Sequence, residues 1–311
     1  MSTPDLPRVA PASGPHGGDG AAIAAALGLD VGSIIDLSAS LNPFAPDVAS
    51  IAARHLDSLR SYPDDRRATE SVAAMLGVDV DRVVLTNGGA EAIALVATEI
   101  GVGAVVDPEF ALYRRHLAHI DPSAPRWRSN PGNPLGRLAR AEETAGVWDE
   151  AFFPLATGTW TRGDEESWRL GSLTKVWACP GLRLGYVIAP DASGTARLRA
   201  RQPQWSVGGL ALAVVDELIA LTDLPAWATS IRSLRGQFAA DLRSLGHAVI
   251  DTDCNWLLIA EAGDLRARLV AERVVVRDCT SFAMAGTIRV ALPRPADYDA
   301  VLTAFDRVKK S

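Results

Sequence analysis

Apolar positions in the first half of the chain alternate between the spacing of strands and the spacing of helices. Short β-branched runs predict strands at residues 83–85 and 104–106. Each run is followed by apolar residues at helical spacing, which predict helices at 90–98 and 110–119. Strands that alternate with helices of this length are typical of parallel sheets in α/β proteins, so this half predicts a doubly wound core.

The pattern changes near residue 208, where longer stretches of helical spacing begin. The predicted helices are 208–221, 225–245 and 264–272, and the predicted strands are 247–251, 255–259, 274–277 and 287–291. We therefore expect an α/β fold whose mostly parallel central sheet has helices on both faces, with a smaller α+β C-terminal domain. The expected division is 1–44 for an N-terminal arm and part of the small domain, 45–205 for a large domain and 206–311 for the small C-terminal domain.

Composition narrows the class of protein. With 311 residues, 48% of them hydrophobic, the chain can bury a sizeable core, and its net charge of −6 argues against a nucleic-acid partner. The three cysteines form no CxxC pair, which argues against a disulfide framework or a structural metal site. No apolar run has membrane-spanning length and the N-terminus lacks a signal-peptide pattern, so we expect a soluble protein of the cytoplasm.

Lysine is rare in this chain, and one lysine stands out. Only three of the 31 basic residues are lysines, and two of these, Lys309 and Lys310, lie at the C-terminal end. Lys175 is the one in the body of the protein. Because arginine stays protonated in proteins whereas lysine can lose its proton, Lys175 is a candidate amine nucleophile. The alternative is a surface lysine that survives by chance.

The residues around Lys175 add groups that suit a phosphate. Ser172 and Thr174 place hydroxyls three and one residues before it, and Arg183 follows eight residues after it. An amine can form a Schiff base with a carbonyl compound, and an arginine with a serine can hold a phosphate. The segment 87–90, Asn-Gly-Gly-Ala, joins a predicted strand to a helix and offers backbone N–H groups to an anion; the alternative is a tight connection only.

Asp149 is the candidate acid. It follows the apolar pair Val147 and Trp148, at the carboxyl end of a predicted parallel strand, where ligands bind in open α/β sheets. A buried carboxylate at this place would need a cationic partner. A helix cap or a solvated loop acid is the alternative.

These motifs together resemble the fold-type-I pyridoxal-phosphate (PLP) enzymes, in the branch of histidinol-phosphate aminotransferases and threonine-phosphate decarboxylases. The resemblance covers almost the whole chain in the same order. It implies the PLP-dependent transferase fold of type I, PLP as cofactor, a homodimer and a small phosphorylated amino-acid substrate. The cofactor-binding residues that it implies are Tyr62, Gly89, Ala90, Phe110, Asn133, Asp149, Ser172, Lys175 and Arg183.

Two of these residues are implied to be catalytic. Lys175 matches the PLP lysine of an S-x-x-K motif, and Asp149 begins a D-E-A-F segment whose aspartate holds the pyridine nitrogen protonated. Asn133, in the segment NPGNPLG at 130–136, matches the asparagine that binds the phenolic oxygen of PLP. Phe110 falls where an aromatic ring stacks on the cofactor, and Tyr62, in a Y-P-D motif, matches a tyrosine that reaches the partner subunit's cofactor phosphate.

Three further residues are implied to bind the substrate. Arg289, in the segment IRVA, matches the arginine for the substrate carboxylate. His16, in the segment HGGD, and Arg277, in RDCTSF, resemble the substrate-phosphate ligands of threonine-phosphate decarboxylases. Ser40 stands where those enzymes have an asparagine, which changes part of that phosphate contact.

The chain is short for this family. Residues 117–130 and 136–149 are too few for the usual strands and helix, so we expect a trimmed edge of the large domain. The function implied is PLP-dependent decarboxylation of L-threonine O-3-phosphate to (R)-1-aminopropan-2-ol O-2-phosphate in cobalamin biosynthesis. The alternatives are an aminotransferase acting on histidinol phosphate or a related amino acid, and a PLP-binding protein without catalysis.

Overall fold

The computed structural model describes residue 14 and residues 16–310, and contacts divide the chain into two units. One of them, the large unit, is Phe44–Ser230. The other, the small unit, combines the described residues up to Pro43 with those from Ile231 to Lys310. Helix α11 (Leu224–Ser244) carries the chain from the first unit into the second. The three-part domain division expected from the sequence stays a prediction.

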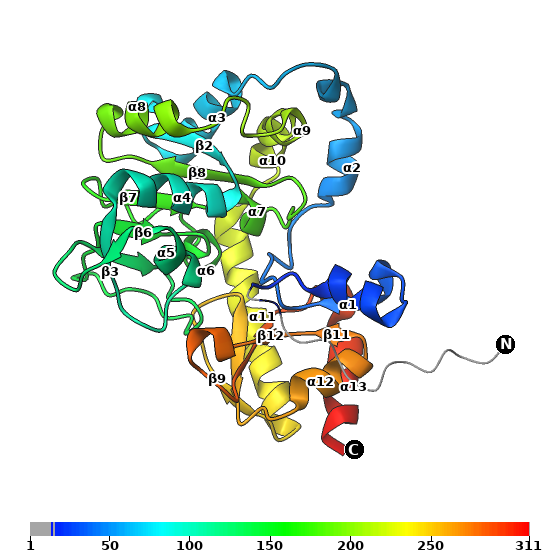
Figure 1. Ribbon diagram of the computed structural model, residues 1–311. Helices are drawn as coiled ribbons and strands as arrows, with labels where there is room; N and C mark the ends of the chain where they lie inside the picture. The colour runs from blue at the N-terminus through cyan, green and yellow to red at the C-terminus, as the bar shows by residue number, and fades with distance from the viewer. Residues whose placement is uncertain (1–13, 15, 311) are drawn as a thin grey trace. The chain divides into compact units, whose positions relative to one another are not determined.

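A seven-stranded sheet forms the centre of the Phe44–Ser230 unit (Figure 1). Its strands in spatial order are β2 (Val83–Asn87), β8 (Leu184–Ile188), β7 (Trp168–Gly171), β6 (Val147–Asp149), β5 (Arg126–Ser129), β3 (Val102–Val105) and β4 (His119–Ile120). Strand β8 is antiparallel to both of its neighbours, and the other pairs are parallel. All strands except β8 therefore end at the same edge of the sheet, which brings the segments that follow them together.

Helices pack on this sheet through one apolar cluster. Helix α4 (Gly88–Ile100) contributes Ile93 and Val96, which pack with strand residues such as Trp127 and Val187. The other helices of the unit are α2 (Val48–Ala53), α3 (Arg66–Leu76), α5 (Ala111–His116), α6 (Phe153–Thr157), α7 (Leu173–Val176), α8 (Ala192–Arg201), α9 (Gly209–Ala213) and α10 (Val215–Ala220).

Three predicted helices differ from the observed ones. The helix predicted at 110–119 ends at His116, because the amides of Ala118 and His119 donate to the carbonyl of Gly101 and start the edge strand β4. Pairing with β3 satisfies backbone groups that a longer helix would leave open at the sheet edge. Apolar residues at helical spacing predict one helix over 48–59, whereas the observed α2 ends at Ala53 and is followed by a 3₁₀ turn. The helix predicted at 208–221 consists of α9 and α10.

The connection between β5 and β6 contains no helix in residues 130–146, all of which the structure describes. One side chain holds its second half. The Arg162 guanidinium donates from Nη2 to the carbonyls of Arg140, Ala141 and Glu143 at 2.8–2.9 Å, and it lies 4.6 Å from the ring centroid of Trp148. The connection from β5 to β6 is therefore a loop that the Arg162 side chain holds in place.

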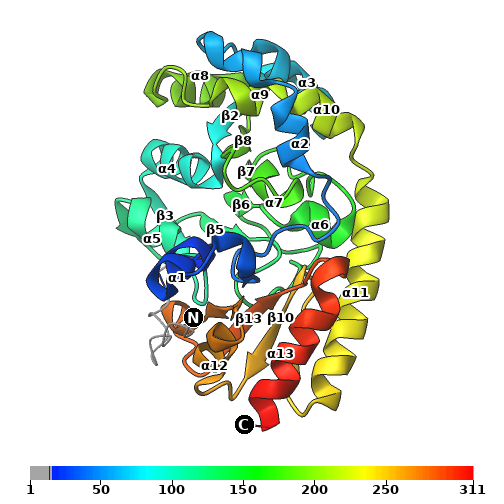
Figure 2. The ribbon, with the colours of Figure 1, turned by 90° about the vertical axis from the view of Figure 1, so that its right-hand side faces the viewer.

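The second unit has its own sheet and helices. Strands β12 (Arg277–Asp278), β13 (Ile288–Ala291), β10 (Trp256–Ala260) and β9 (Ala248–Ile250) form an antiparallel sheet, and β1 (Ile35–Asp36) pairs in parallel with β11 (Val274–Val275). Its helices are α1 (Gly20–Leu27), α12 (Leu265–Ala271), α13 (Tyr298–Lys310) and most of α11. Figure 2 shows α13 alongside α11, where the rings of Phe238 and Phe305 meet edge to face at 6.3 Å.

Among the residues that the structure describes, no helix is long and apolar enough to cross a membrane. Within the same residues, no group of three or more His, Cys, Asp or Glu side chains could hold a metal ion.

Candidate active site

The common edge of the large sheet collects residues from five strand ends. Lys175 lies in α7, directly after β7, and Asp149 is the last residue of β6. Phe110, Asn133 and the pair Gly89 and Ala90 follow β3, β5 and β2. Apart from Tyr62 and Arg183, the predicted cofactor residues therefore lie at or just after the ends of strands that meet at one edge of the sheet.

Lys175 and Asp149 interact electrostatically. Burial raises the pKa of Asp149 above its ordinary value, while hydrogen bonds from Tyr113 and Ala151 and the charge of Lys175 oppose that rise. The Lys175 amine lies 5.7 Å from the ring centroid of Phe152, which is buried. Lys175 therefore places an amine, which can act as a nucleophile, within the field of the Asp149 carboxylate.

Two donors fix the Asp149 carboxylate. The Tyr113 hydroxyl donates to Oδ2 at 2.7 Å, and the backbone amide of Ala151 donates to Oδ1 at 3.0 Å. Each oxygen keeps capacity for a further donor, because a carboxylate oxygen has two lone pairs. Asp149 can therefore accept a proton-bearing nitrogen while its orientation stays fixed.

The start of α4 lies against Ser172 and Arg183. Gly88 has a φ of +71°, and a side chain at this position would collide with the Arg183 guanidinium. A Cβ on Gly89 would lie 3.6 Å from the Ser172 Cβ. The geometry thus brings a helix N-terminus, a serine and an arginine together, which is a suitable arrangement for a phosphate dianion.

A second buried cluster lies after β3 and β5. The buried Glu109 carboxylate accepts from the amide of Ser129 at 3.1 Å and from its hydroxyl, and the amide of Asn133 donates to the Ser129 Oγ at 2.8 Å. Burial raises the pKa of Glu109 to about 7. Phe110, next in sequence to Glu109, is half-buried and meets the Tyr113 ring edge to face at 6.0 Å.

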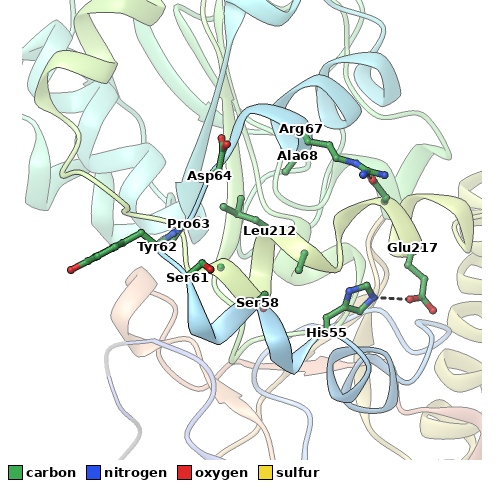
Figure 3. A pocket seen from close by; sticks show the side chains of 13 residues that line it. His55, Ser58, Ser61, Tyr62, Pro63, Asp64, Arg67, Ala68, Leu212 and Glu217 are labelled. Carbon is green, nitrogen blue, oxygen red and sulfur yellow. Dashed lines mark hydrogen bonds and ion pairs between the residues drawn. The ribbon is translucent and has the colours of Figure 1, made fainter.

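Tyr62 lies at the surface of the same unit. Its side chain is 78% exposed, and its ring lies 4.5 Å from that of Trp205, which is also exposed. Tyr62 lines a pocket of about 490 Å³, and in Figure 3 its ring points away from the other lining side chains. On the far side of this pocket, His55 is bonded to Glu217 at 2.9 Å (Figure 3).

The predicted substrate residues belong to the other unit. Arg277 and Arg289 are register partners on the antiparallel strands β12 and β13, so their side chains leave the same face of the sheet. Both are buried, and burial lowers the pKa of Arg289 to about 10. Arg289 also stacks on Trp256, with 5.0 Å from its guanidinium carbon to the ring centroid.

The segment around His16 is hydrogen-bonded to the residues that contact Arg277 and Arg289. The carbonyl of Ser38 accepts from Arg289 at 3.1 Å, and the Ser38 hydroxyl accepts from the amide of Gly18 at 2.8 Å. Arg277 donates to the carbonyl of Gly14 at 2.6 Å. His16 is half-buried within this segment, so the three predicted substrate residues are connected through Ser38 and Gly14.

Comparison with known proteins identifies the family. Residues 129–305, more than half of the chain, match the family model described as aminotransferase class I and II. The chain belongs to this family. Membership makes the chain an enzyme with PLP as cofactor, which confirms both predictions.

Named relatives include both kinds of enzyme in the predicted branch. Threonine-phosphate decarboxylase of Salmonella typhimurium is 29% identical, over 94% of this chain and 96% of the relative. A histidinol-phosphate aminotransferase of Mycobacterium bovis is 30% identical, over 73% of this chain and 74% of the relative.

Solved structures support the predicted fold class. L-Threonine-O-3-phosphate decarboxylase of Porphyromonas gingivalis has a TM-score of 0.77 at 21% identity, covering 89% of this chain and all of that one. Histidinol-phosphate aminotransferase of Sinorhizobium meliloti, solved with PLP, has a TM-score of 0.83 at 16% identity and covers 96% of this chain and 95% of that one. The fold predicted from the sequence is confirmed.

Three residues of this site do not follow from the sequence motifs. Tyr113 bonds to Asp149, Ser129 bonds to Asn133 and Glu109 bonds to Ser129, yet none of the three is a predicted site residue. The spacing of Tyr113, three residues after Phe110, places both on one side of a helical turn and is the signal that could have identified it. The sequence has no comparable signal for the contact between Glu109 and Ser129. These residues come together only because β3, which precedes Glu109, pairs with β5, which ends at Ser129.

Proposed function

We propose that this enzyme decarboxylates L-threonine O-3-phosphate, giving (R)-1-aminopropan-2-ol O-2-phosphate for cobalamin biosynthesis. The bond between Cα and the carboxyl carbon breaks, CO2 leaves, and Cα takes up a proton. The opposed pair Arg277 and Arg289 carries this proposal, because two buried guanidinium groups on one sheet face suit a substrate with two anionic groups.

The residues of the large unit fit PLP. A side chain on Gly88 would collide with Arg183, so glycine at this position lets the Arg183 guanidinium lie against the start of α4, where the two could hold a phosphate group together. Asp149, whose oxygens are held by Tyr113 and Ala151, would bind the pyridine nitrogen, with Phe110 against the ring and Asn133 near its phenolic oxygen. When bound, PLP withdraws electrons from the substrate Cα.

Lys175 is proposed to move the protons. Its amine would release the bound substrate nitrogen and deliver a proton to Cα after CO2 has left, which needs the neutral and the charged form in turn. The Lys175 amine lies 5.7 Å from the centre of the Phe152 ring and within the field of Asp149, so it is held at the sheet edge where these steps would take place. Arg289 would hold the substrate carboxylate, and Arg277 and His16 the phosphate.

Transamination of histidinol phosphate or a related amino acid is the second candidate. The 30% identical Mycobacterium bovis relative favours it. The same groups serve both reactions, because the bond that breaks is decided by the pose of the substrate. An aminotransferase needs a 2-oxo acid acceptor, whereas a decarboxylase releases CO2 without one.

We propose further that a second copy of the chain covers the Tyr62 surface. An exposed tyrosine stacked on an exposed tryptophan beside a pocket is typical of an interface. Light scattering on the purified protein is expected to give the mass of a dimer. Tyr62→Ala is then expected to weaken PLP binding, and a monomer with unchanged PLP affinity would contradict this.

The reaction is tested with substrate labelled at the carboxyl carbon. Protein loaded with PLP is expected to release labelled CO2 with no acceptor present, and Lys175→Ala is expected to lose both this activity and the visible absorbance of the bound cofactor. Lys309→Ala, which removes an exposed lysine, is the matched control. Turnover only with a 2-oxo acid and without CO2 would establish the aminotransferase instead.

A further inference from the structure

Tyr113 is a fully buried residue whose hydroxyl interacts with Asp149 and Ser129. Its exposure is 0%, and its ring lies 5.5 Å from that of Trp127 and 6.0 Å from that of Phe110. These two rings fix the direction of the phenol. Its hydroxyl donates to Asp149 Oδ2 at 2.7 Å. A phenol held in this way cannot turn from Asp149 without displacing the core of the unit.

Burial also secures the direction of this hydrogen bond. The pKa of Tyr113 lies well above its ordinary value, because burial raises it and the charges of Asp149 and Glu109 raise it further. The phenol therefore keeps its proton and acts as the donor. Donation to a carboxylate favours the ionised form, which opposes the rise that burial causes in the pKa of Asp149.

Glu109 is a second buried carboxyl group in the same neighbourhood. It accepts from the amide and hydroxyl of Ser129, and it is 6% exposed. Burial raises its pKa to about 7, the charge of Asp149 raises it, and the charge of Arg128 lowers it. Since a Coulomb interaction is mutual, a charge on Glu109 makes Asp149 a stronger base.

We propose that Tyr113 is a positioning residue that sets the orientation of Asp149, and that Glu109, held by Ser129, the register partner of Asp149, acts on Asp149 through its charge. The inference rests on the proposed role of Asp149 at the pyridine nitrogen. Tyr113 aligns Asp149 and favours its ionised form, and Glu109, whose pKa is about 7, gains charge as the pH rises through neutrality. The charged groups that face the pair are Lys175 on the side of Asp149 and Arg128 on the side of Glu109.

Tyr113→Phe tests the first part, with Tyr186→Phe as control. Tyr186 is also buried, and its hydroxyl donates over a long distance, 3.5 Å, to the carbonyl of Trp160. Titration with PLP is expected to show a dissociation constant about tenfold higher for Tyr113→Phe, since one hydrogen bond to a charged group is lost. The pH midpoint of the cofactor's visible band is expected to shift as well, and Tyr186→Phe should change neither.

A purely structural role of Tyr113 would lower the unfolding temperature of the PLP-free protein and leave the dissociation constant and the midpoint unchanged. That result would overturn the proposal. Glu109→Gln gives a second test that does not depend on the folding of the tyrosine variant. It is expected to weaken the pH dependence of PLP binding between pH 5 and 8, and an unaltered dependence would contradict the role of Glu109.

Asp149→Asn separates this inference from the function on which it rests. If this variant binds PLP like the wild type, the proposed role of Asp149 fails. If Asp149→Asn weakens PLP binding and Tyr113→Phe does not, only the positioning role fails. If both variants weaken PLP binding, the double variant is expected to bind PLP as tightly as Asp149→Asn alone, since both substitutions act through one carboxylate.

Discussion

Arg277 and Arg289 lie directly opposite each other on neighbouring antiparallel strands, and both are buried. Like charges in such a pair repel each other, so the arrangement has an energetic cost that an anion between them would remove. This relationship makes the small unit a candidate receptor for a molecule with two anionic groups.

Replacing Arg289 by lysine tests whether this residue binds the substrate carboxylate. Lysine keeps the charge but cannot hold a carboxylate with two parallel hydrogen bonds, so we expect KM for L-threonine O-3-phosphate to rise at least about tenfold. Steady-state CO2 release measures it, and Arg294→Lys, at an exposed position, is the control. An unchanged KM in Arg289→Lys would remove Arg289 from substrate binding.

Gly88→Ala tests the phosphate side of the site. The variant combines a left-handed backbone conformation with a collision against Arg183, so we expect weaker PLP binding as well as lower stability. Gly77→Ala is the matched control, because Gly77 has a similar φ of +68° and no atom near the added carbon. It is expected to cost about 1 kcal/mol of stability and leave the PLP dissociation constant unchanged. Equal PLP affinities in the two variants would contradict the assignment.

Glu109→Gln is expected to change the pH dependence of folding in the PLP-free protein. The pKa of Glu109 is about 7 in the folded state against an ordinary 4.5, so its stabilising contribution is complete below pH 4.5 and is lost as the pH rises to 7. The free energy of unfolding of the variant, relative to wild type, should therefore rise over this interval by on the order of 2–3 kcal/mol.

Urea unfolding at pH 4.5 and pH 7.5 measures this difference. Glu166→Gln, which removes an exposed carboxylate, is the control and should follow the wild type. A difference between Glu109→Gln and wild type that does not vary with pH would show that folding does not raise the pKa of Glu109.

Arg162→Ala is expected to release the connection between β5 and β6. The variant loses three hydrogen bonds to carbonyls and the contact with Trp148, which together are worth about 2–4 kcal/mol. A protease that cuts after glutamate should then cleave near Glu142 faster than in wild type. Arg137→Ala, an exposed position in the same connection, should not change the rate.

The sequence predicts a helix accurately where neighbouring residues alone determine its bounds. The apolar spacing at 66–75 predicts a helix, and the structure has one at Arg66–Leu76, since its apolar side is regular and Gly77 ends it. The helix predicted at 110–119 is too long because pairing of β4 with β3, a contact between distant residues, decides its end. Helix α13 was not predicted, although Val301 and Phe305 are spaced for a buried face.

The same limit applies to the site. The motifs around Lys175 and Asp149 could be recognised because each is a run of neighbouring residues. The contact between Tyr113 and Asp149 joins residues 36 positions apart, and it exists only because β3 and β6 lie in one sheet. The roles of the predicted site residues stay predictions.

The scarcity of lysine gives the chain an unusual chemical label. Lys309 and Lys310 end α13, and Lys175 lies half-buried after β7. An amine-acylating reagent, followed by peptide mass spectrometry, would therefore report on one interior side chain with little background. Protection of Lys175 by PLP, compared with constant labelling of Lys309, would measure cofactor occupancy in a cell extract without any assay of turnover.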